Sequence, residues 1–218
     1  MNLIEIASLF GSVSSQDKTI AGIGIDSRKL KPGELFIAIR GKQFDGHDYI
    51  QQAANKGALA VICEQPDKNT PIEQIRVPDT VNALAMIATL YRQTMPCPAI
   101  ALTGSNGKTT VKEMIANILP APAHATPGNF NNELGVPLSL FQLKPQHRYA
   151  VFELGANHAG EIAKTVSMVQ PQVTLINNIA PAHIEGFGSI DGVAHAKGEI
   201  HQGLMDGGTA IINDDDDY

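Results

Sequence analysis

The segment TGSNGKTT, residues 103–110, combines two glycines with a lysine and two threonines. An apolar stretch, residues 99–103, precedes it, and a stretch with helical periodicity, residues 108–119, follows it. Glycines let the backbone turn tightly and bring its N–H groups close to an oxyanion, and the start of a helix adds partial positive charge. The segment therefore predicts a triphosphate-binding loop between a strand and a helix, which requires an α/β fold.

The predicted loop is shorter than the usual phosphate-binding loop, in which four residues separate the two glycines. Its candidate nucleotide-binding residues are Gly104, Ser105, Asn106, Gly107, Lys108, Thr109 and Thr110. Lys108 can neutralise phosphate, and the Thr109 hydroxyl can hold Mg²⁺. A chance Gly-Lys-Thr at a helix start is the alternative, which the flanking strand and helix disfavour.

Composition excludes several classes of protein. The chain of 218 residues is 43% hydrophobic and 17% charged, which is typical of a packed globular protein. A net charge of −6 argues against a nucleic-acid partner. No apolar run approaches the roughly 18–20 residues that span a bilayer, so we expect no membrane insertion. The first residues lack a basic leader, and Cys63 and Cys97 are isolated, so we expect a reduced, cytoplasmic protein.

Residues 1–79 are expected to form one domain of the α/β class. Its strands are predicted at 22–26, 35–39 and 58–63, with a helix at 49–56. A loop containing Pro66, Pro71 and Pro78 leads to a boundary near residue 80.

Residues 80–218 repeat a strand, a loop and a helix, which is typical of a mostly parallel sheet covered by helices. Strands are predicted at 99–103, 149–154, 173–177 and 209–212, and helices beginning near Thr80 and spanning 108–119, 159–169 and 193–204. The chain ends directly after the last of these strands, so we expect only part of this second domain to be present.

The helix at 108–119 has a predicted apolar face. Val111, Met114, Ile115, Ile118 and Leu119 recur at helical spacing, so we expect this face to be buried. By the same pattern Lys112 and Glu113 should face solvent.

Lys197 stands on or beside the apolar face of the helix predicted at 193–204. A buried ammonium ion costs several kcal/mol unless it is compensated. The side chain could extend to the surface, as lone lysines usually do. Alternatively, burial lowers its pKa, and the neutral amine takes up CO₂ to form a carbamate that can bind Mg²⁺.

Glu153 ends one predicted strand and His183 follows another. Ligands of open α/β sheets gather at the carboxyl ends of the strands, where the phosphate-binding loop also opens. Each residue alone could be an ordinary strand-end or loop residue. Together with Lys108 and Thr109 they outline a magnesium–triphosphate site.

These residues resemble the Mur ligases of peptidoglycan synthesis. The family has a short phosphate-binding loop, a glutamate after the next strand, a histidine after the following strand and a carbamylated lysine. In this chain the matching positions are TGSNGKTT, Glu153, His183 and Lys197, which resemble that pattern. Further similar segments are TPGNFNNELGVPLSL, ELGANHAGEI, NNIAPAHIEGFGSIDGVAHAKGEI, DSRKLKPGELFIAIRG and FDGHDYI. The resemblance covers essentially the whole chain.

The resemblance implies an N-terminal UDP-substrate-binding domain (1–79) and a truncated central ATP-binding domain of the P-loop type (80–218), with the C-terminal domain absent. It also implies an ATP-dependent ligase, closest to those that join D-Ala-D-Ala to UDP-MurNAc-tripeptide. In such a reaction the substrate carboxylate becomes an acyl phosphate, which the amine then attacks. We expect a monomer in which this fragment alone is catalytically incomplete.

The resemblance also implies roles for individual residues. Lys108, His183 and Lys197 would be catalytic. Thr109 and Glu153 would hold one Mg²⁺, and His183 with carbamylated Lys197 a second.

The substrate-binding residues implied by the resemblance are Ser27, Arg28, Arg40, Gly46, His47, Asn131 and Asn132. Arginine suits a diphosphate because its planar head gives paired hydrogen bonds. From spacing alone, solvated loop charges are the favoured interpretation of Arg28 and Arg40. Asparagines in such a loop more often serve the turn itself.

Three alternative functions stay open. The first is the Mur-type ligase that adds the third amino acid, against which the stretches GNFNN and EGFGS argue. The second is a phosphotransferase acting on a hydroxyl acceptor. The third is a nucleotide-substrate binding module without turnover.

Overall fold

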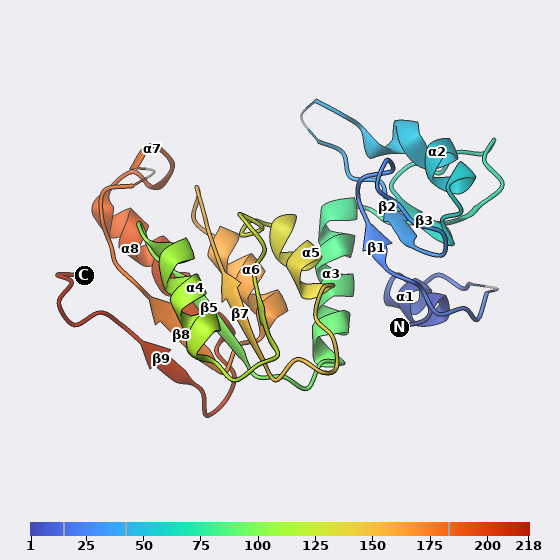
Figure 1. Ribbon diagram of the computed structural model, residues 1–218. Coiled ribbons are helices and arrows are strands. Elements are labelled where there is room, and N and C mark those ends of the chain that lie inside the picture. Colours follow the sequence, from blue (N-terminus) through green and yellow to red (C-terminus); the bar gives the residue numbers. More distant parts are fainter. Residues whose placement is uncertain (15, 42, 183) are drawn as a thin grey trace. The chain divides into compact units, whose positions relative to one another are not determined.

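The computed structural model describes residues 1–14, 16–41, 43–182 and 184–218 (Figure 1). It divides into two compact units, residues 1–87 and 88–218. The division falls inside helix α3 (Thr80–Gln93), which begins where the sequence predicted a boundary.

The first unit contains a parallel sheet of four strands in the order β1-β2-β3-β4. Its elements are α1 (Leu3–Leu9), β1 (Ile23–Gly24), β2 (Leu35–Ile37), the 3-10 helix η1 (Gly46–Tyr49), α2 (Ile50–Asn55), β3 (Ala60–Cys63) and β4 (Glu73–Arg76). Strands β2 and β3 are buried throughout, which agrees with their apolar sequences.

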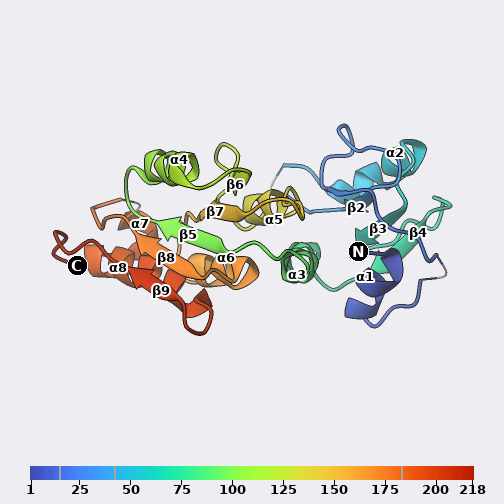
Figure 2. The ribbon, with the colours of Figure 1, turned by 60° about the horizontal axis from the view of Figure 1, so that its bottom comes forward.

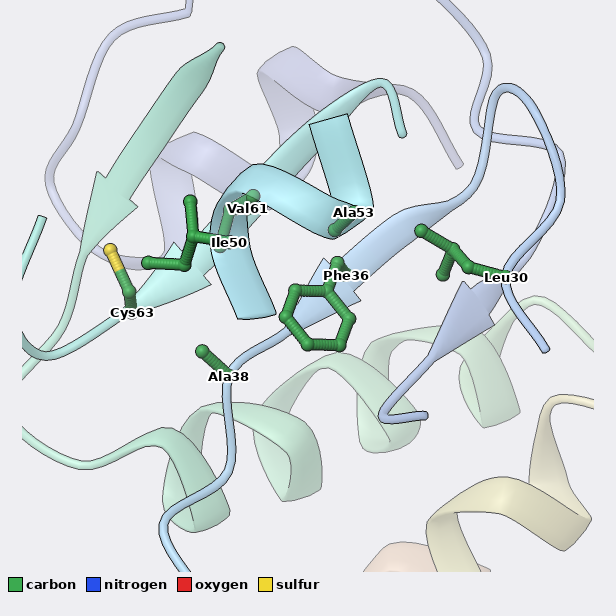
Figure 3. Close-up of a cluster of buried hydrophobic side chains, with 7 residues drawn as sticks. All are labelled: Leu30, Phe36, Ala38, Ile50, Ala53, Val61 and Cys63. Atoms are coloured by element: carbon green, nitrogen blue, oxygen red, sulfur yellow. The ribbon is translucent and has the colours of Figure 1, made fainter. Parts of the chain in front are cut away.

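A cluster of buried side chains fills the space between this sheet and α2. Figure 3 shows Phe36 of β2 below Ile50 and Ala53 of α2. Its members are Leu30, Phe36, Ala38, Ile50, Ala53, Val61 and Cys63. Burying apolar surface in this way is the main source of stability for such a unit.

The second unit contains a five-stranded parallel sheet in the order β6-β7-β5-β8-β9. Its elements are β5 (Ala99–Thr103), α4 (Lys108–Ile118), β6 (Ala123–Ala125), α5 (Gly135–Leu140), β7 (Tyr149–Glu153), α6 (Glu161–Val169), β8 (Val173–Ile176), α7 (Ile184–Phe187), α8 (Ile190–Gly198), the 3-10 helix η2 (Glu199–Gly203) and β9 (Thr209–Ile211). Figure 2 shows α4 on one side of this sheet and α6 and α8 on the other. The predicted α/β class with parallel sheets is confirmed.

The register of the central strands brings three loops to one edge of the sheet. Leu102 of β5 pairs with Glu153 of β7, and Thr103 pairs with Ile176 of β8. Because all three strands are parallel, the segments that follow them emerge side by side.

Two edge strands escaped the sequence prediction. β4 lies in the segment read as a proline-containing loop, and β6 lies in a segment for which no element was predicted. β4 reads Glu-Gln-Ile-Arg, and only Ile75 is buried, because an edge strand shares only one long side with the sheet.

The helix predicted at 193–204 is two elements in the structure, since the α-helix α8 ends at Gly198 and the 3-10 helix η2 begins at Glu199.

The predicted orientation of α4 is wrong for Lys112, Met114 and Ile118, whereas Glu113 faces solvent as expected. Lys112 is only 1% exposed, whereas Met114 is 62% and Ile118 is 81% exposed. The buried ammonium donates a hydrogen bond to the backbone oxygen of Thr126 at 2.8 Å. This partner lets a lysine occupy a position that the hydrophobic pattern alone assigns to solvent.

No helix within the described ranges is long and apolar enough to cross a membrane.

Gly198, the last residue of α8, and Gly203, the last residue of η2, provide a matched test of packing. A Cβ at Gly203 would lie 2.7 Å from a methyl group of Val166 and 2.8 Å from its backbone oxygen, whereas a Cβ at Gly198 would meet nothing within 4 Å. We expect Gly203→Ala to lower the free energy of unfolding by about 1–3 kcal/mol. Gly198→Ala, in a right-handed helical conformation, should leave it unchanged or raise it slightly. Urea unfolding of both variants measures this, and equal effects would contradict the packing argument.

Candidate functional site

The loop predicted to bind phosphate leads into helix α4, whose first backbone amides are open. Gly107 is the N-cap residue, with φ at 71°, a conformation that favours glycine. No side chain caps this helix end. The first amides of a helix have no partners within it, so they can donate to phosphate oxygens.

A second loop, which follows β8, supports the phosphate-binding loop. The amide of Ser105 donates to the backbone oxygen of Asn178, and the amide of Asn106 donates to Asn178 Oδ1, both at 2.9 Å. The Ser105 hydroxyl donates to the oxygen of Ala180 and accepts from its amide, also at 2.9 Å. The sequence reasoning missed Asn178, although its place directly after the strand that pairs with β5 is a signal that could have found it.

Close contact between these two loops favours a glycine. A Cβ at Gly104 would lie 3.0 Å from Cβ of Asn177 and 3.3 Å from the amide of Asn178. Gly104 therefore allows the phosphate-binding loop to approach the backbone of the β8 loop.

Lys108 folds back over the phosphate-binding loop. Its ammonium donates to the backbone oxygens of Gly104, at 2.9 Å, and Ser105, at 3.4 Å. The positive charge therefore lies against the loop that leads into the open first amides of α4. Thr110, two residues after Lys108 in α4, is exposed.

Glu153 receives two hydrogen bonds from side chains of other elements. Its carboxylate accepts from the Thr109 hydroxyl and from Asn131 Nδ2, each at 2.9 Å. Glu153 is 2% exposed and forms no ion pair with any described residue. A hydroxyl and a buried carboxylate in contact are oxygen donors of the type that Mg²⁺ prefers.

Lys197 is buried, which agrees with the second of the two alternatives left open by the sequence. It is 2% exposed, and burial, followed by the positive charge of Lys108, lowers the pKa of its amine from 10.5 to about 8. The influence of Lys108 means that the two lysines lie near each other. A neutral amine is the form that reacts with CO₂, so this environment fits the carbamate hypothesis.

The candidate ligand His183 lies outside the described residues. Among the residues that the structure describes, no group of three or more His, Cys, Asp or Glu side chains could hold a metal ion. The structure thus brings Lys108, Thr109, Glu153 and Lys197 to one edge of the sheet, and the complete predicted set of metal ligands stays a prediction.

The first unit has a pocket of about 300 Å³ that includes three of the predicted substrate-binding residues. It is lined by Ile25, Asp26, Ser27, Arg28, Phe36, Ile39, Phe44, Gly46 and Tyr49. Arg28 is exposed and pairs with Asp26 at 2.9 Å. The pocket combines aromatic and apolar walls with polar groups, which suits a flat heterocycle bearing a charged tail.

Arg40 and His47 do not line this pocket. Arg40 pairs with Asp45 at 2.8 Å, and Asp45 also contacts Nδ1 of His47 at 2.5 Å. Burial raises the pKa of Asp45, but the hydrogen bonds from His47 and Arg40 outweigh it and lower this pKa to about 2. His47 Nε2 accepts from the amide of Glu64 at 2.9 Å, so both ring nitrogens serve the fold.

The two asparagines have different surroundings. Asn131 contacts Glu153, whereas Asn132 Oδ1 accepts from the amides of Leu134, at 3.2 Å, and Gly135, at 2.8 Å. Asn132 therefore stabilises the start of α5, as the alternative turn reading predicted.

Comparison with known families gives matches over both units. Residues 102–218 match the profile of the Mur ligase middle domain, and residues 19–92 match that of the Mur ligase family catalytic domain.

Similar individual proteins are found among characterised sequences and solved structures. The UDP-N-acetylmuramoyl-tripeptide–D-alanyl-D-alanine ligase of Escherichia coli is 49% identical over 209 residues, covering 95% of this chain and 46% of the relative. A crystal structure of MurF from Acinetobacter baumannii aligns with a TM-score of 0.91 at 40% identity, covering 99% of this chain and 49% of that one. The MurF ligase of Thermotoga maritima in complex with ADP aligns with a TM-score of 0.83 at 33% identity, covering 89% and 46%. The chain thus spans about half the length of the relatives it matches.

The lowered pKa of Lys197 makes stability depend on pH. The unfolded chain holds this proton up to about pH 10.5, whereas the folded chain releases it near pH 8. The free energy of unfolding should therefore rise with pH across this window, because the unfolded state binds more protons there. Lys197→Met should abolish that rise, and Lys164→Met, at an exposed position of α6, should keep it. Urea unfolding in bicarbonate-free buffer measures the slopes; identical slopes in all three proteins would contradict the burial of a titrating amine.

Proposed function

We propose, from the membership of this chain in the Mur ligase family, that the protein joins D-Ala-D-Ala to UDP-MurNAc-tripeptide with conversion of ATP to ADP. The observation that carries this proposal is the arrangement at the sheet edge. Three groups lie together at the start of α4: its open first amides, the ammonium of Lys108, and the hydrogen-bonded pair of Thr109 and Glu153.

The proposed reaction is difficult because a carboxylate repels both a triphosphate and an incoming amine. Transfer of the γ-phosphate to the carboxylate provides a leaving group, after which the amine can form the amide. Bringing two anions together requires neutralisation, which Lys108 and the first amides of α4 would supply. Lys108 is suited to this role because its ammonium already contacts the loop.

The residues at this edge fit the divalent cation that the family implies. Bound Mg²⁺ would neutralise phosphate charge. Thr109 and Glu153 would hold one ion, and His183 with carbamylated Lys197 would hold a second. The hydrogen bond between Thr109 and Glu153 supports the first assignment, because it already orients both oxygens.

The pocket in the first unit would take the uridine nucleotide of the substrate. Ser27, Arg28 and Gly46 line it, so these three of the implied residues are the ones we assign to this role. Arg40 and His47 would contribute indirectly. They hold Asp45, which precedes the pocket residue Gly46 in the chain. Asn131 would contact substrate only if it released Glu153.

The relatives favour this ligation over the addition of the third amino acid, because their names specify D-alanyl-D-alanine as the added group. The structure aligned with bound ADP supports the use of ATP. We also propose that the protein acts as a monomer in the cytoplasm, where the unpaired Cys63 and Cys97 would stay reduced.

The proposed function predicts that phosphate release requires all three substrates. Because the chain spans about half the length of its relatives and we expect it to be catalytically incomplete by itself, turnover is measured in the full-length protein that contains it. That protein would be incubated with Mg-ATP, UDP-MurNAc-tripeptide and D-Ala-D-Ala, and phosphate and amide product would be measured together. Lys108→Met should reduce both by at least about a hundredfold, because a charged group facing the transferred phosphate is removed. Arg76→Met, at an exposed position of β4 in the first unit, is the control.

Other outcomes identify the alternatives. Turnover with UDP-MurNAc-dipeptide and a free amino acid would indicate the third-residue ligase, and phosphorylation of a hydroxyl acceptor would indicate a phosphotransferase. Calorimetric binding of the UDP substrate without any turnover would indicate a binding module.

The carbamate on Lys197 is a separate prediction. In ¹³C-bicarbonate near pH 8, where this amine is about half neutral, a carbamate carbon signal should appear in the nuclear magnetic resonance spectrum. The signal should weaken as the pH falls below 8, because the amine becomes protonated. Lys197→Met should lack it, and Lys164→Met should keep it. A signal that persists in Lys197→Met would reject the assignment.

A further inference from the structure

Lys112 and Thr126 connect helix α4 to the carboxylate of Glu153. We propose that these two residues position the pair formed by Thr109 and Glu153, and thereby set the affinity of the site for a divalent cation bound with a nucleotide. The cation-binding part of this inference rests on the proposed function.

Lys112 is a charged residue in a place where an apolar residue would pack. It is 1% exposed, lies three residues after Thr109 in α4, and donates to the backbone oxygen of Thr126 at 2.8 Å. Its other partner is Glu113, at 3.0 Å, whose side chain is 57% exposed. Ion pairs with exposed partners contribute little, so the bond to Thr126 is the principal compensation for burying the ammonium.

Thr126 carries this connection from α4 to β7. It follows β6 directly, is 1% exposed, and its amide donates to the oxygen of Val151 at 3.0 Å. Its hydroxyl accepts a hydrogen bond from the amide of Glu153 at 3.0 Å. The backbone of Glu153 is therefore held by a side chain whose own backbone is held by Lys112.

The connections close into a ring. From α4, Lys112 reaches Thr126, Thr126 reaches the amide of Glu153, and the carboxylate of Glu153 returns to α4 through Thr109. Asn131 holds the second carboxylate oxygen. A ring of this kind fixes the distance between the first turn of α4 and the end of β7, which are the two elements that carry Thr109 and Glu153.

The closing experiment uses two substitutions that remove one connection each. Lys112→Met keeps most of the buried volume but removes the donor, and Thr126→Val keeps the shape but removes the hydroxyl. Amide hydrogen exchange of Glu153 should become about five- to tenfold faster in both, the size expected from weakening one hydrogen bond. Amides between β5 and β8, which lie outside the ring, should exchange as in the parent.

Cation binding is measured with Mn²⁺ and ADP, using electron paramagnetic resonance to count free Mn²⁺. We expect both variants to bind the Mn²⁺–ADP pair roughly ten- to a hundredfold more weakly than the parent, as is typical when a group that orients a metal ligand is removed. The double variant should lose no more than the weaker-binding single variant, because both act through one ring. Thr126→Ser, which retains the hydroxyl, should restore the parent affinity.

Glu113→Gln is the control, because it removes the exposed partner of Lys112 and leaves the ring intact. Unchanged amide exchange at Glu153 in Lys112→Met would overturn the positioning role, regardless of the measured affinity for Mn²⁺–ADP. Parent-like Mn²⁺–ADP affinity in both single variants would overturn the effect on the cation. If the parent itself binds no Mn²⁺–ADP, the proposed function fails, and the exchange measurement still decides whether Lys112 positions Glu153.

Discussion

Strand β5 pairs in parallel with β7 on one side and with β8 on the other, so the segments after all three strands leave the sheet together. The phosphate-binding loop follows β5, Glu153 ends β7, and Asn178 follows β8. Backbone hydrogen bonds of the sheet therefore fix the relative positions of groups that are 25 to 75 residues apart in sequence. Each side chain then needs only one or two local contacts to be oriented.

Two buried lysines show how far sequence reasoning reaches. For Lys197 the sequence offered burial as one of two alternatives, because Val193 and Ile200 place it on or beside an apolar face, and both of these residues are buried. The burial of Lys112 was not predicted, because the partner that compensates it, the backbone oxygen of Thr126, follows a strand that the sequence did not reveal. A hydrophobic pattern reports which residue types cluster on a helix, but not which backbone groups of other elements lie opposite them.

The first unit shows a similar limit. The strands β2 and β3 could be predicted because both are buried along their whole length, whereas the polar edge strand β4 could not. The resemblance supplied Ser27, Arg28 and Gly46, which line one pocket, together with Arg40 and His47, which support the neighbouring Asp45. A shared motif contains both residues that line a pocket and residues that hold the neighbouring loop in place. The three-dimensional structure is needed to tell the two kinds apart.

The sheet edge also concentrates groups that cost stability. Lys108 and Lys197 lie near each other without an ion-pair partner among the described residues, and Lys197 is buried. Thr103, the last residue of β5, has a buried hydroxyl with no hydrogen-bond partner in the part of the chain that the structure describes. An unpaired buried hydroxyl costs about 1–3 kcal/mol, and close positive charges add to that cost. An anion at the open amides of α4 would relieve the repulsion between the lysines, so the electrostatic part of this cost would fall if phosphate binds there as proposed.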